Sequence, residues 1–160
     1  MKIKNILLFV VFTFPITALA QDDLIFNKLQ SAISNYSAKI DECNILRNKN
    51  NLESIDIEEI KDIVKKNPSV LSYLSEKAYN NCLQPERGLL AEVILYSTTE
   101  NKNNQAFVLG ESTRKVSFHP DFNDEIIFNK LTKKEQLKLL SITNLETPFD
   151  ALELMDRIIE

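Results

Sequence analysis

Apolar residues recur every three or four positions along most of the chain, which is the spacing of one face of an amphipathic helix. One such stripe starts at Asp22 or Asp23, ends near Arg47, and contains Ile25, Leu29, Ile33, Tyr36, Ile40 and Cys43. After a polar break, a shorter helix is predicted to carry Ile57, Ile60, Ile63 and Val64. The pattern therefore predicts a mainly helical fold.

Two proline-containing segments predict further helix starts. An Asn side chain accepts hydrogen bonds from the free N–H groups of a first turn and proline fits the first helical position, so Asn67-Pro68 is predicted to open a helix. The apolar side of this helix carries Val70, Leu71, Leu74, Ala78 and Cys82. Pro85 is predicted to open the next helix, which is the most apolar after the N-terminal segment and contains Leu89, Leu90, Val93, Ile94 and Leu95. We expect it to be the central helix.

Two helix starts are also predicted near the C-terminus. Thr132 and Glu135 have the spacing of a capping box, in which each residue satisfies a backbone N–H of the other. Leu137 and Leu140 are expected to face inward from that helix. Thr147 followed by Pro148 predicts a last helix, and its apolar stripe would be Phe149, Leu152, Met155 and Ile159.

The segment from Phe107 to Phe118 has a less regular pattern. Apolar and polar residues alternate on both sides of Gly110, which favours a short β-hairpin over a distorted helix. The predicted fold class is therefore mainly α: a compact bundle of six or seven helices, with the option of one β-hairpin.

The first 20 residues have the three regions of a cleavable secretory signal. Lys2 and Lys4 precede an apolar run over 6–14, and small residues at Ala18 and Ala20 suit a signal peptidase, so cleavage is expected between Ala20 and Gln21. The apolar run is shorter than the about 20 residues of a membrane-spanning helix. We therefore expect a signal peptide at 1–20, a single helical domain at 21–160, export to the periplasm or the extracellular space, and no stable membrane insertion after cleavage.

Charge and glycine content limit the function classes. The sequence has 19 basic and 23 acidic residues, and loss of Lys2 and Lys4 with the leader leaves 17 basic residues and a net charge of -6. Because nucleic-acid binding relies on clustered positive charge, a nucleic-acid partner is not expected, whereas a basic protein is a suitable one. With only 2 glycines, the chain lacks the glycine-rich loops that hold phosphates.

The two cysteines, Cys43 and Cys82, both lie on predicted inward helix faces. In an exported domain such a pair predicts a disulfide, here between two helices. A redox or metal pair is disfavoured because the cysteines are far apart in sequence and only one histidine, His119, accompanies them. No metal site, catalytic histidine or cofactor is expected.

Two function classes remain from the sequence. One is binding of another protein, as an inhibitor, an immunity factor or an accessory subunit of an envelope or secretion complex. Its candidate surface is the aromatic segment with Phe107, Phe118, His119 and Phe122, although four phenylalanines in one segment, Phe128 included, more often form a small satellite core. The alternative is a glycan-cleaving, cell-wall enzyme, for which Glu86 and Glu92 are the candidate carboxylates.

Overall fold

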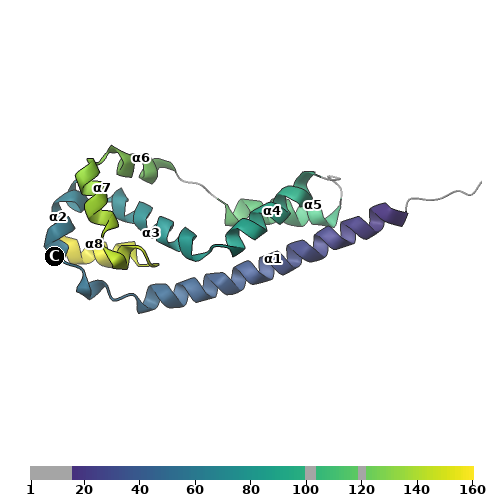
Figure 1. Ribbon diagram of the computed structural model, residues 1–160, viewed down its shortest axis with the longest axis horizontal. Coiled ribbons are helices and arrows are strands. Elements are labelled where there is room, and N and C mark those ends of the chain that lie inside the picture. Colours follow the sequence, from purple (N-terminus) through teal and green to yellow (C-terminus); the bar gives the residue numbers. More distant parts are fainter. Residues whose placement is uncertain (1–15, 100–103, 119–121) are drawn as a thin grey trace, which may run out of the picture.

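The computed structural model describes residues 16–99, 104–118 and 122–160, with side chains described from residue 23 (Figure 1). Its described part contains eight α-helices: α1 (Ile16–Lys49), α2 (Ile57–Lys66), α3 (Ser69–Cys82), α4 (Glu86–Thr99), α5 (Gln105–Ser117), α6 (Phe122–Lys130), α7 (Lys133–Leu140) and α8 (Ala151–Ile159). Two short 3-10 helices, Leu52–Ser54 and Thr143–Leu145, lie in the connections. No strand occurs among these residues, so the mainly α prediction is confirmed.

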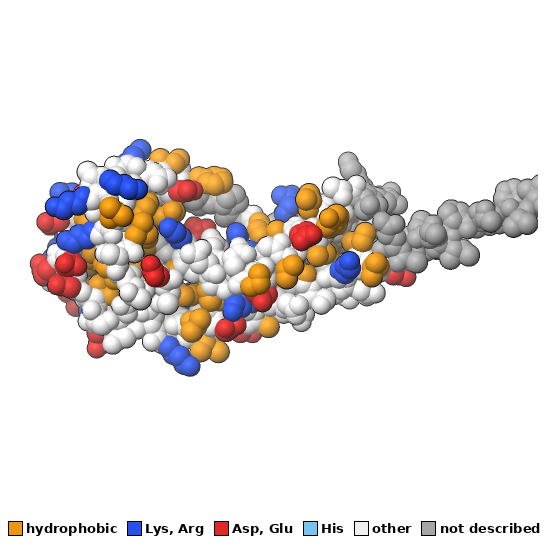
Figure 2. All heavy atoms as spheres, viewed as in Figure 1, with side chains coloured by type: hydrophobic (Ala, Val, Ile, Leu, Met, Phe, Trp, Pro, Cys, Tyr) orange, Lys and Arg blue, Asp and Glu red, His pale blue; other side chains and the backbone are white. Residues whose placement is uncertain are grey.

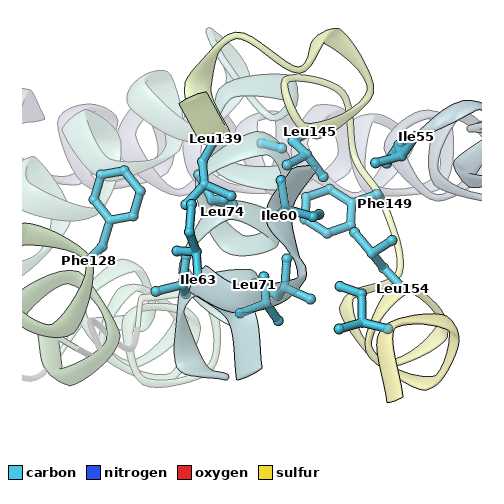
Figure 3. Close-up of a cluster of buried hydrophobic side chains, with 14 of the residues drawn as sticks. Ile55, Ile60, Ile63, Leu71, Leu74, Phe128, Leu139, Leu145, Phe149 and Leu154 are labelled. Carbon is cyan, nitrogen blue, oxygen red and sulfur yellow. The ribbon is translucent and has the colours of Figure 1, made fainter. Parts of the chain in front are cut away.

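Helices α2, α3, α6, α7 and α8 pack together at one end of the molecule and form a unit that we call the head (Figure 1). They enclose the larger of two hydrophobic clusters, which has 16 buried residues. Ile60, Leu71, Leu139, Phe149 and Leu154 are at its centre and are almost completely buried (Figure 3). The ring of Tyr73 on α3 stacks on that of Phe128 on α6, with 4.6 Å between ring centroids.

The second unit, which we call the arm, consists of α1, α4 and α5. Helix α1 has 34 residues, which corresponds to a length of about 50 Å, and it runs along the molecule beneath α4 and α5 (Figure 1). The arm holds a smaller cluster with six buried residues: Leu29, Tyr36, Cys43, Leu83, Leu90 and Ile94. Helix α4 is therefore not the central helix of the fold, as the sequence had predicted, but one of three helices in the arm.

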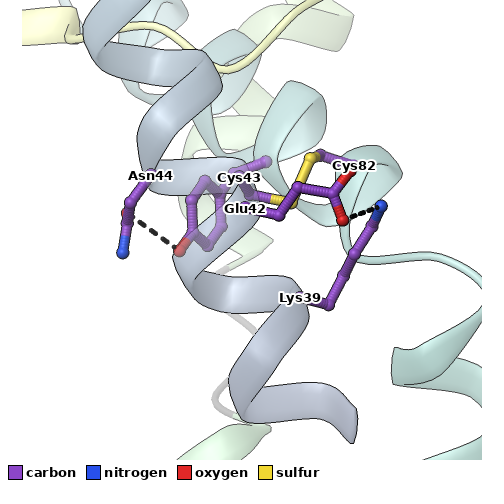
Figure 4. Close-up of a disulfide and its surroundings, with 6 residues drawn as sticks. Lys39, Glu42, Cys43, Asn44 and Cys82 are labelled. Atoms are coloured by element: carbon purple, nitrogen blue, oxygen red, sulfur yellow. Dashed lines mark hydrogen bonds and ion pairs between the residues drawn. A yellow bond between two sulfur atoms is a disulfide. The ribbon is translucent and has the colours of Figure 1, made fainter.

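Two connections attach the end of α1 to the rest of the molecule. The Cys43–Cys82 disulfide joins α1 to the last residue of α3, with 6.0 Å between the Cα atoms (Figure 4). Beside it, the Tyr79 hydroxyl donates a 3.1 Å hydrogen bond to Asn44 Oδ1. One residue after α1, Asn50 Nδ2 donates to the backbone oxygen of Asn144 at 2.7 Å. The predicted disulfide between two helices is confirmed.

The predicted β-hairpin is wrong, because residues 105–117 form helix α5. Gly110, interpreted as a turn residue, lies in the helix interior and does not have a positive φ. Its role is to let α5 approach α4: a Cβ atom at Gly110 would lie 2.1 Å from Ser97 Oγ. Ser97 is fully buried, and its hydroxyl donates to Ile94 O at 2.8 Å. The glycine therefore reflects a close contact between two helices. With α5, the described part of the chain has one helix more than the six or seven that were predicted.

The capping box of Thr132 and Glu135 at the start of α7 is confirmed, but the predicted start of the last helix is wrong. Helix α8 begins at Ala151, and the Asp150 carboxylate caps it by accepting from Leu152 N and Glu153 N. Thr147 instead accepts a hydrogen bond from Asn50 Nδ2 at 2.9 Å. Because α8 begins later than predicted, a different set of its residues is buried.

The buried residues of α8 are Leu154 and Ile158, whereas Leu152 and Ile159, which the sequence stripe had included, are exposed. In α7, Leu139 is buried and Leu140 packs against the head cluster, but Leu137 is exposed. The expectation for Leu140 holds, and that for Leu137 is wrong. Both short helices have several apolar residues outside the buried stripe, so spacing alone did not select the right face.

Candidate functional site

The aromatic residues that the sequence suggested as a partner surface do not all lie on one face. Phe107 on α5 is half-buried, and Phe118, at the end of α5, packs against the arm cluster. Phe128 is buried in the head cluster, so Phe118 and Phe128 pack in two different hydrophobic clusters. Phe122 is 61% exposed at the start of α6. His119 lies outside the described residues.

A groove between α1 and α4 forms an apolar hollow on the arm. It has a volume of about 690 Å³, and its lining consists of five apolar residues, Leu24, Ile25, Leu89, Val93 and Tyr96, and two charged ones, Lys28 and Glu92. Leu24 and Leu89 are each 54% exposed and Tyr96 is 58% exposed. We call this the α1–α4 groove. The arm thus exposes several large apolar side chains beside one another along a concave surface. Single exposed apolar residues are common on proteins, but a continuous apolar surface of this kind is not.

The exposed apolar surface continues around the arm. On the other side of α1, Phe26 together with Val108 and Leu109 of α5 lines a shallower hollow of about 390 Å³. Leu95 on α4 is also exposed, at 62%. Figure 2 shows hydrophobic side chains distributed over the arm, whereas basic and acidic side chains are prominent on the head.

The charges of the two units differ. Residues 50–85 and 122–160, which form the head and its connections, contain 14 acidic and 9 basic residues. Residues 23–49, 86–99 and 104–118, which form the arm, contain 6 acidic and 7 basic residues. The negative net charge therefore belongs to the head, and the arm combines near neutrality with exposed apolar surface.

A second, polar pocket lies where α3, α6 and the start of α4 meet, and we call it the Arg87 pocket. Its volume is about 250 Å³. Helix α3 contributes Tyr73, Glu76, Lys77, Asn80 and Asn81, and the other lining residues are Arg87, Phe122 and Glu125. Burial raises the pKa of Tyr73, and the negative charge of Glu125 raises it further, so these two groups are close enough to interact. The pocket carries two positive and two negative side chains.

The two carboxylates suggested for glycan cleavage do not share a pocket. Glu92 is exposed and lines the α1–α4 groove, which Glu86 does not line. Six residues of helix separate them, so they project about 120° apart around α4 and about 9 Å apart along it. Oε2 of Glu86 is buried and has no hydrogen-bond partner within the described part of the chain. The geometry does not form the facing pair that glycoside hydrolysis requires.

Two further features concern only the residues with described positions. No three His, Cys, Asp or Glu side chains among them gather closely enough to hold a metal ion. None of the helices in that part combines the length and apolar character of a membrane span.

The fold and these surfaces define an all-α protein with one disulfide, an apolar grooved arm and an acidic head. Comparison with protein families, with curated proteins and with solved structures finds no match to this chain.

Sequence reasoning missed both hollows, although one signal for the groove was present. The α4 segment is rich in apolar residues, which predicts a helix that is buried on most sides. Leu89 and Leu95 are exposed instead. The Arg87 pocket had no such signal, because its lining comes from three helices whose arrangement the sequence pattern does not specify.

Proposed function

We propose that this protein is exported and acts by binding another protein, and that the α1–α4 groove receives an amphipathic helix of that partner. The observation that supports this most is the exposure of Leu24, Leu89 and Tyr96 along one concave surface. A helix that is apolar on most sides is stable in water when most of those sides are covered. Helix α4 is covered by α1 and α5, and its residues Leu89, Val93 and Tyr96 line the groove.

The shape of the groove favours a helix as the occupant. Two helices packed side by side leave a furrow between them, and a third helix laid in such a furrow completes a three-helix unit. The partner helix would present apolar residues at every third and fourth position. Lys28 and Glu92, one on each wall, have opposite charges and suit a helix with an acidic residue on one flank and a basic residue on the other.

The acidic head has a separate role in this proposal. Its net negative charge attracts a basic surface of the same partner and speeds association, while the apolar contact in the groove controls dissociation. Added salt is therefore expected to slow association and to leave the dissociation rate largely unchanged.

Export is the second part of the proposal. The disulfide is compatible with an oxidising compartment, since such bonds are rare in the reducing cytosol. Cleavage between Ala20 and Gln21 would also leave Asp22 and Asp23 in the first turn of α1, where acidic residues interact favourably with the helix dipole. Mass spectrometry of protein recovered from its native host tests this part. We expect an N-terminus at Gln21, and an intact Met1 on the disulfide-bonded protein would contradict export.

Site-specific photo-crosslinking tests the binding surface. A photoreactive amino acid at Tyr96, inside the groove, is expected to give one discrete adduct in the native host, and the same group at Leu152, exposed on the head, is expected to give none. Leu89→Asp should abolish the Tyr96 adduct. Leu137→Asp is the matched control, because Leu137 is 57% exposed and Leu89 is 54% exposed. Adducts of equal strength from both positions, or a Tyr96 adduct that survives Leu89→Asp, would contradict the proposed surface.

A further inference from the structure

The Cys43–Cys82 disulfide joins the two units of the molecule at their junction (Figure 4). Cys43 is completely buried and belongs to the six-residue cluster of the arm. Cys82 is the last residue of α3, a helix of the head, and is only partly buried. The sequence contains no other cysteine, so the oxidation state of the chain's thiols is that of this one bond.

The hydrogen bonds that hold the end of α1 to the head are individually weak. The Tyr79 hydroxyl donates to Asn44 Oδ1 at 3.1 Å, and Asn50 Nδ2 donates to the backbone oxygen of Asn144 at 2.7 Å. Because water can replace the partner of each group when the contact opens, such a bond contributes little net stability. Helix α1 forms one wall of the α1–α4 groove. The position of that wall therefore depends mainly on the small arm cluster and on the disulfide.

The head does not depend on the bond in the same way. Its cluster has 16 buried residues and includes neither cysteine. The arm cluster has six buried residues, and one of them is Cys43. Elements with few buried apolar contacts open locally more often than well-packed elements do. Cleavage of the disulfide is therefore expected to loosen the groove while the head stays folded, so oxidation acts selectively on the unit that carries the groove.

We propose that the disulfide is a redox switch for the α1–α4 groove: the dithiol form of the chain leaves α1 loosely held and does not retain the partner helix, and oxidation completes the groove. This inference rests on the proposed function of the groove. A site that is formed for only a fraction of the time loses affinity in proportion to that fraction. The protein therefore binds its partner after export, where disulfides form, and not in the reducing cytosol.

The oxidant is a disulfide-bearing oxidoreductase, and the reaction is thiol–disulfide exchange. Cys43 is completely buried in the folded protein, so the exchange runs through Cys82. The Cys82 thiolate attacks the oxidant's disulfide, which forms a mixed disulfide and releases one oxidant thiolate. The Cys43 thiolate then attacks the Cys82 sulfur and releases the second oxidant thiolate. Two electrons and two protons pass from the chain to the oxidant, and reduction by a thiol follows the same path in reverse.

Photo-crosslinking from position 96 in the native host tests the switch. With the photoreactive group at Tyr96, we expect the double variant Cys43→Ala and Cys82→Ala to give at least about tenfold less adduct per chain than the protein with both cysteines. Leu139→Ala is the control, because it removes buried volume from the head cluster and destabilises the protein away from the groove. Its adduct should persist. Circular dichroism of the purified variants checks that each one is folded.

The outcomes separate the switch from the proposed function. Equal adduct from the double variant and from the protein with both cysteines contradicts the switch and leaves the proposed function standing. An equal loss of adduct in folded Leu139→Ala also contradicts the switch, because the effect would then follow general stability. Absence of the adduct when both cysteines are present contradicts the proposed function, and the switch with it.

A second test needs no partner. The purified, disulfide-bonded protein is treated with reduced glutathione, free thiols are trapped with N-ethylmaleimide, and the products are mapped by mass spectrometry. We expect glutathione on Cys82 and maleimide on Cys43, because the attacking thiolate reaches only the Cys82 sulfur. Glutathione on Cys43 would overturn the assigned route of exchange.

Discussion

The head and the arm are both built from helices, but they differ in how completely they bury their apolar residues. The head cluster has 16 buried residues, and five large apolar side chains remain exposed on its helices: Phe122, Ile126, Leu137, Leu152 and Ile159. In the arm only six residues form the buried cluster, and eight are exposed: Leu24, Ile45, Leu46, Leu89, Leu95, Tyr96, Val108 and Val116. Since burial of apolar area is the main stabilising contribution to folding, the head stabilises itself more than the arm does.

This difference shows where the arm obtains its stability. Its cluster includes Cys43, and Cys82 at the end of α3 packs against it, so the disulfide fastens the arm core to the head. The tight contact between Gly110 and Ser97 brings α5 onto α4 without a large side chain between them. A covalent bond and close backbone packing thus compensate for a small core, and the apolar residues that remain exposed are available to a partner.

The difference in stability between the head and the arm is expected to increase most when the disulfide is removed by the double substitution Cys43→Ala and Cys82→Ala. The cysteines are 39 residues apart, and a loop of that length corresponds to about 4 kcal/mol of stabilisation in the chain-entropy model. Amide hydrogen exchange should show the loss mainly in α1 and α4 of the arm, with α2 and α8 of the head still protected.

Two results distinguish this from a general loss of stability. Reduction of the wild-type protein by a thiol should give the same pattern as the double variant, because both remove the covalent link, although reduction leaves the sulfur atoms in place. Equal loss of protection in α1 and α8, or earlier loss in α8, would show that the arm does not depend on the disulfide for its stability more than the head does.

A smaller effect is expected from Gly110→Ala, which places a Cβ atom against Ser97 Oγ. Overpacking of a buried contact typically costs about 1 to 3 kcal/mol, and here the added Cβ would meet the short, fully buried side chain of Ser97, so α4 and α5 must move apart. Urea denaturation followed by circular dichroism measures the change. Protection of α5 amides should fall more than that of α3 amides.

Gly88→Ala is the matched control for this substitution. Gly88 also lies in a helix, and its nearest neighbour, Gln84 Oε1, is the end of a flexible side chain at 3.2 Å. Alanine is favoured over glycine inside helices by about 1 kcal/mol, so this variant should be as stable as wild type or more stable. If Gly110→Ala is also as stable as wild type, the close contact of α4 and α5 does not contribute to the stability of the arm.

The comparison of head and arm also explains which parts of the fold could be predicted from sequence. Helix starts with one dominant cap were found, as with Thr132 and Glu135 of α7. The start of α8 was missed because Thr147 and Asp150 are both good caps, and the choice depends on Asn50, which is distant in sequence. Gly110 was misinterpreted for a similar reason, since a glycine in a turn and a glycine in a helix contact look alike until Ser97 is placed beside it.

The candidate sites show the same limit. The disulfide could be predicted, because both cysteines fall on inward helix faces. Phe122 is exposed, as a surface residue would be, but the exposure of Tyr96 and Leu24 could not be predicted, because helical spacing gives one face of a helix and says nothing of the neighbour that covers it. The Arg87 pocket depends on three helices, and local patterns contain no information on their mutual arrangement.

The smallest effect concerns two carboxylates, one in each unit. Hydrogen bonds from the Thr132 side chain and backbone lower the pKa of Glu135 in the head, and a hydrogen bond from Arg114 lowers the pKa of Glu111 in the arm. A carboxyl with a lowered folded-state pKa stabilises the fold above its unfolded pKa of about 4.5, and this stabilisation is lost as the pH falls through the folded value. Glu135→Gln and Glu111→Gln should therefore lower stability slightly at pH 7, with the difference from wild type vanishing below the folded-state pKa.

Salt separates the two contributions. The partner of Glu111 is charged, with Arg114 Nη2 and Glu111 Oε2 3.0 Å apart, so added salt should remove most of the effect of Glu111→Gln. The partner of Glu135 is the neutral Thr132, whose backbone N–H donates to Glu135 Oε2 at 2.8 Å, and salt should change the effect of Glu135→Gln less. Urea midpoints at low and high ionic strength measure both. An equal salt response would mean that the cap of the head and the ion pair of the arm act through the same long-range charge, and the local origin assigned to each would be wrong.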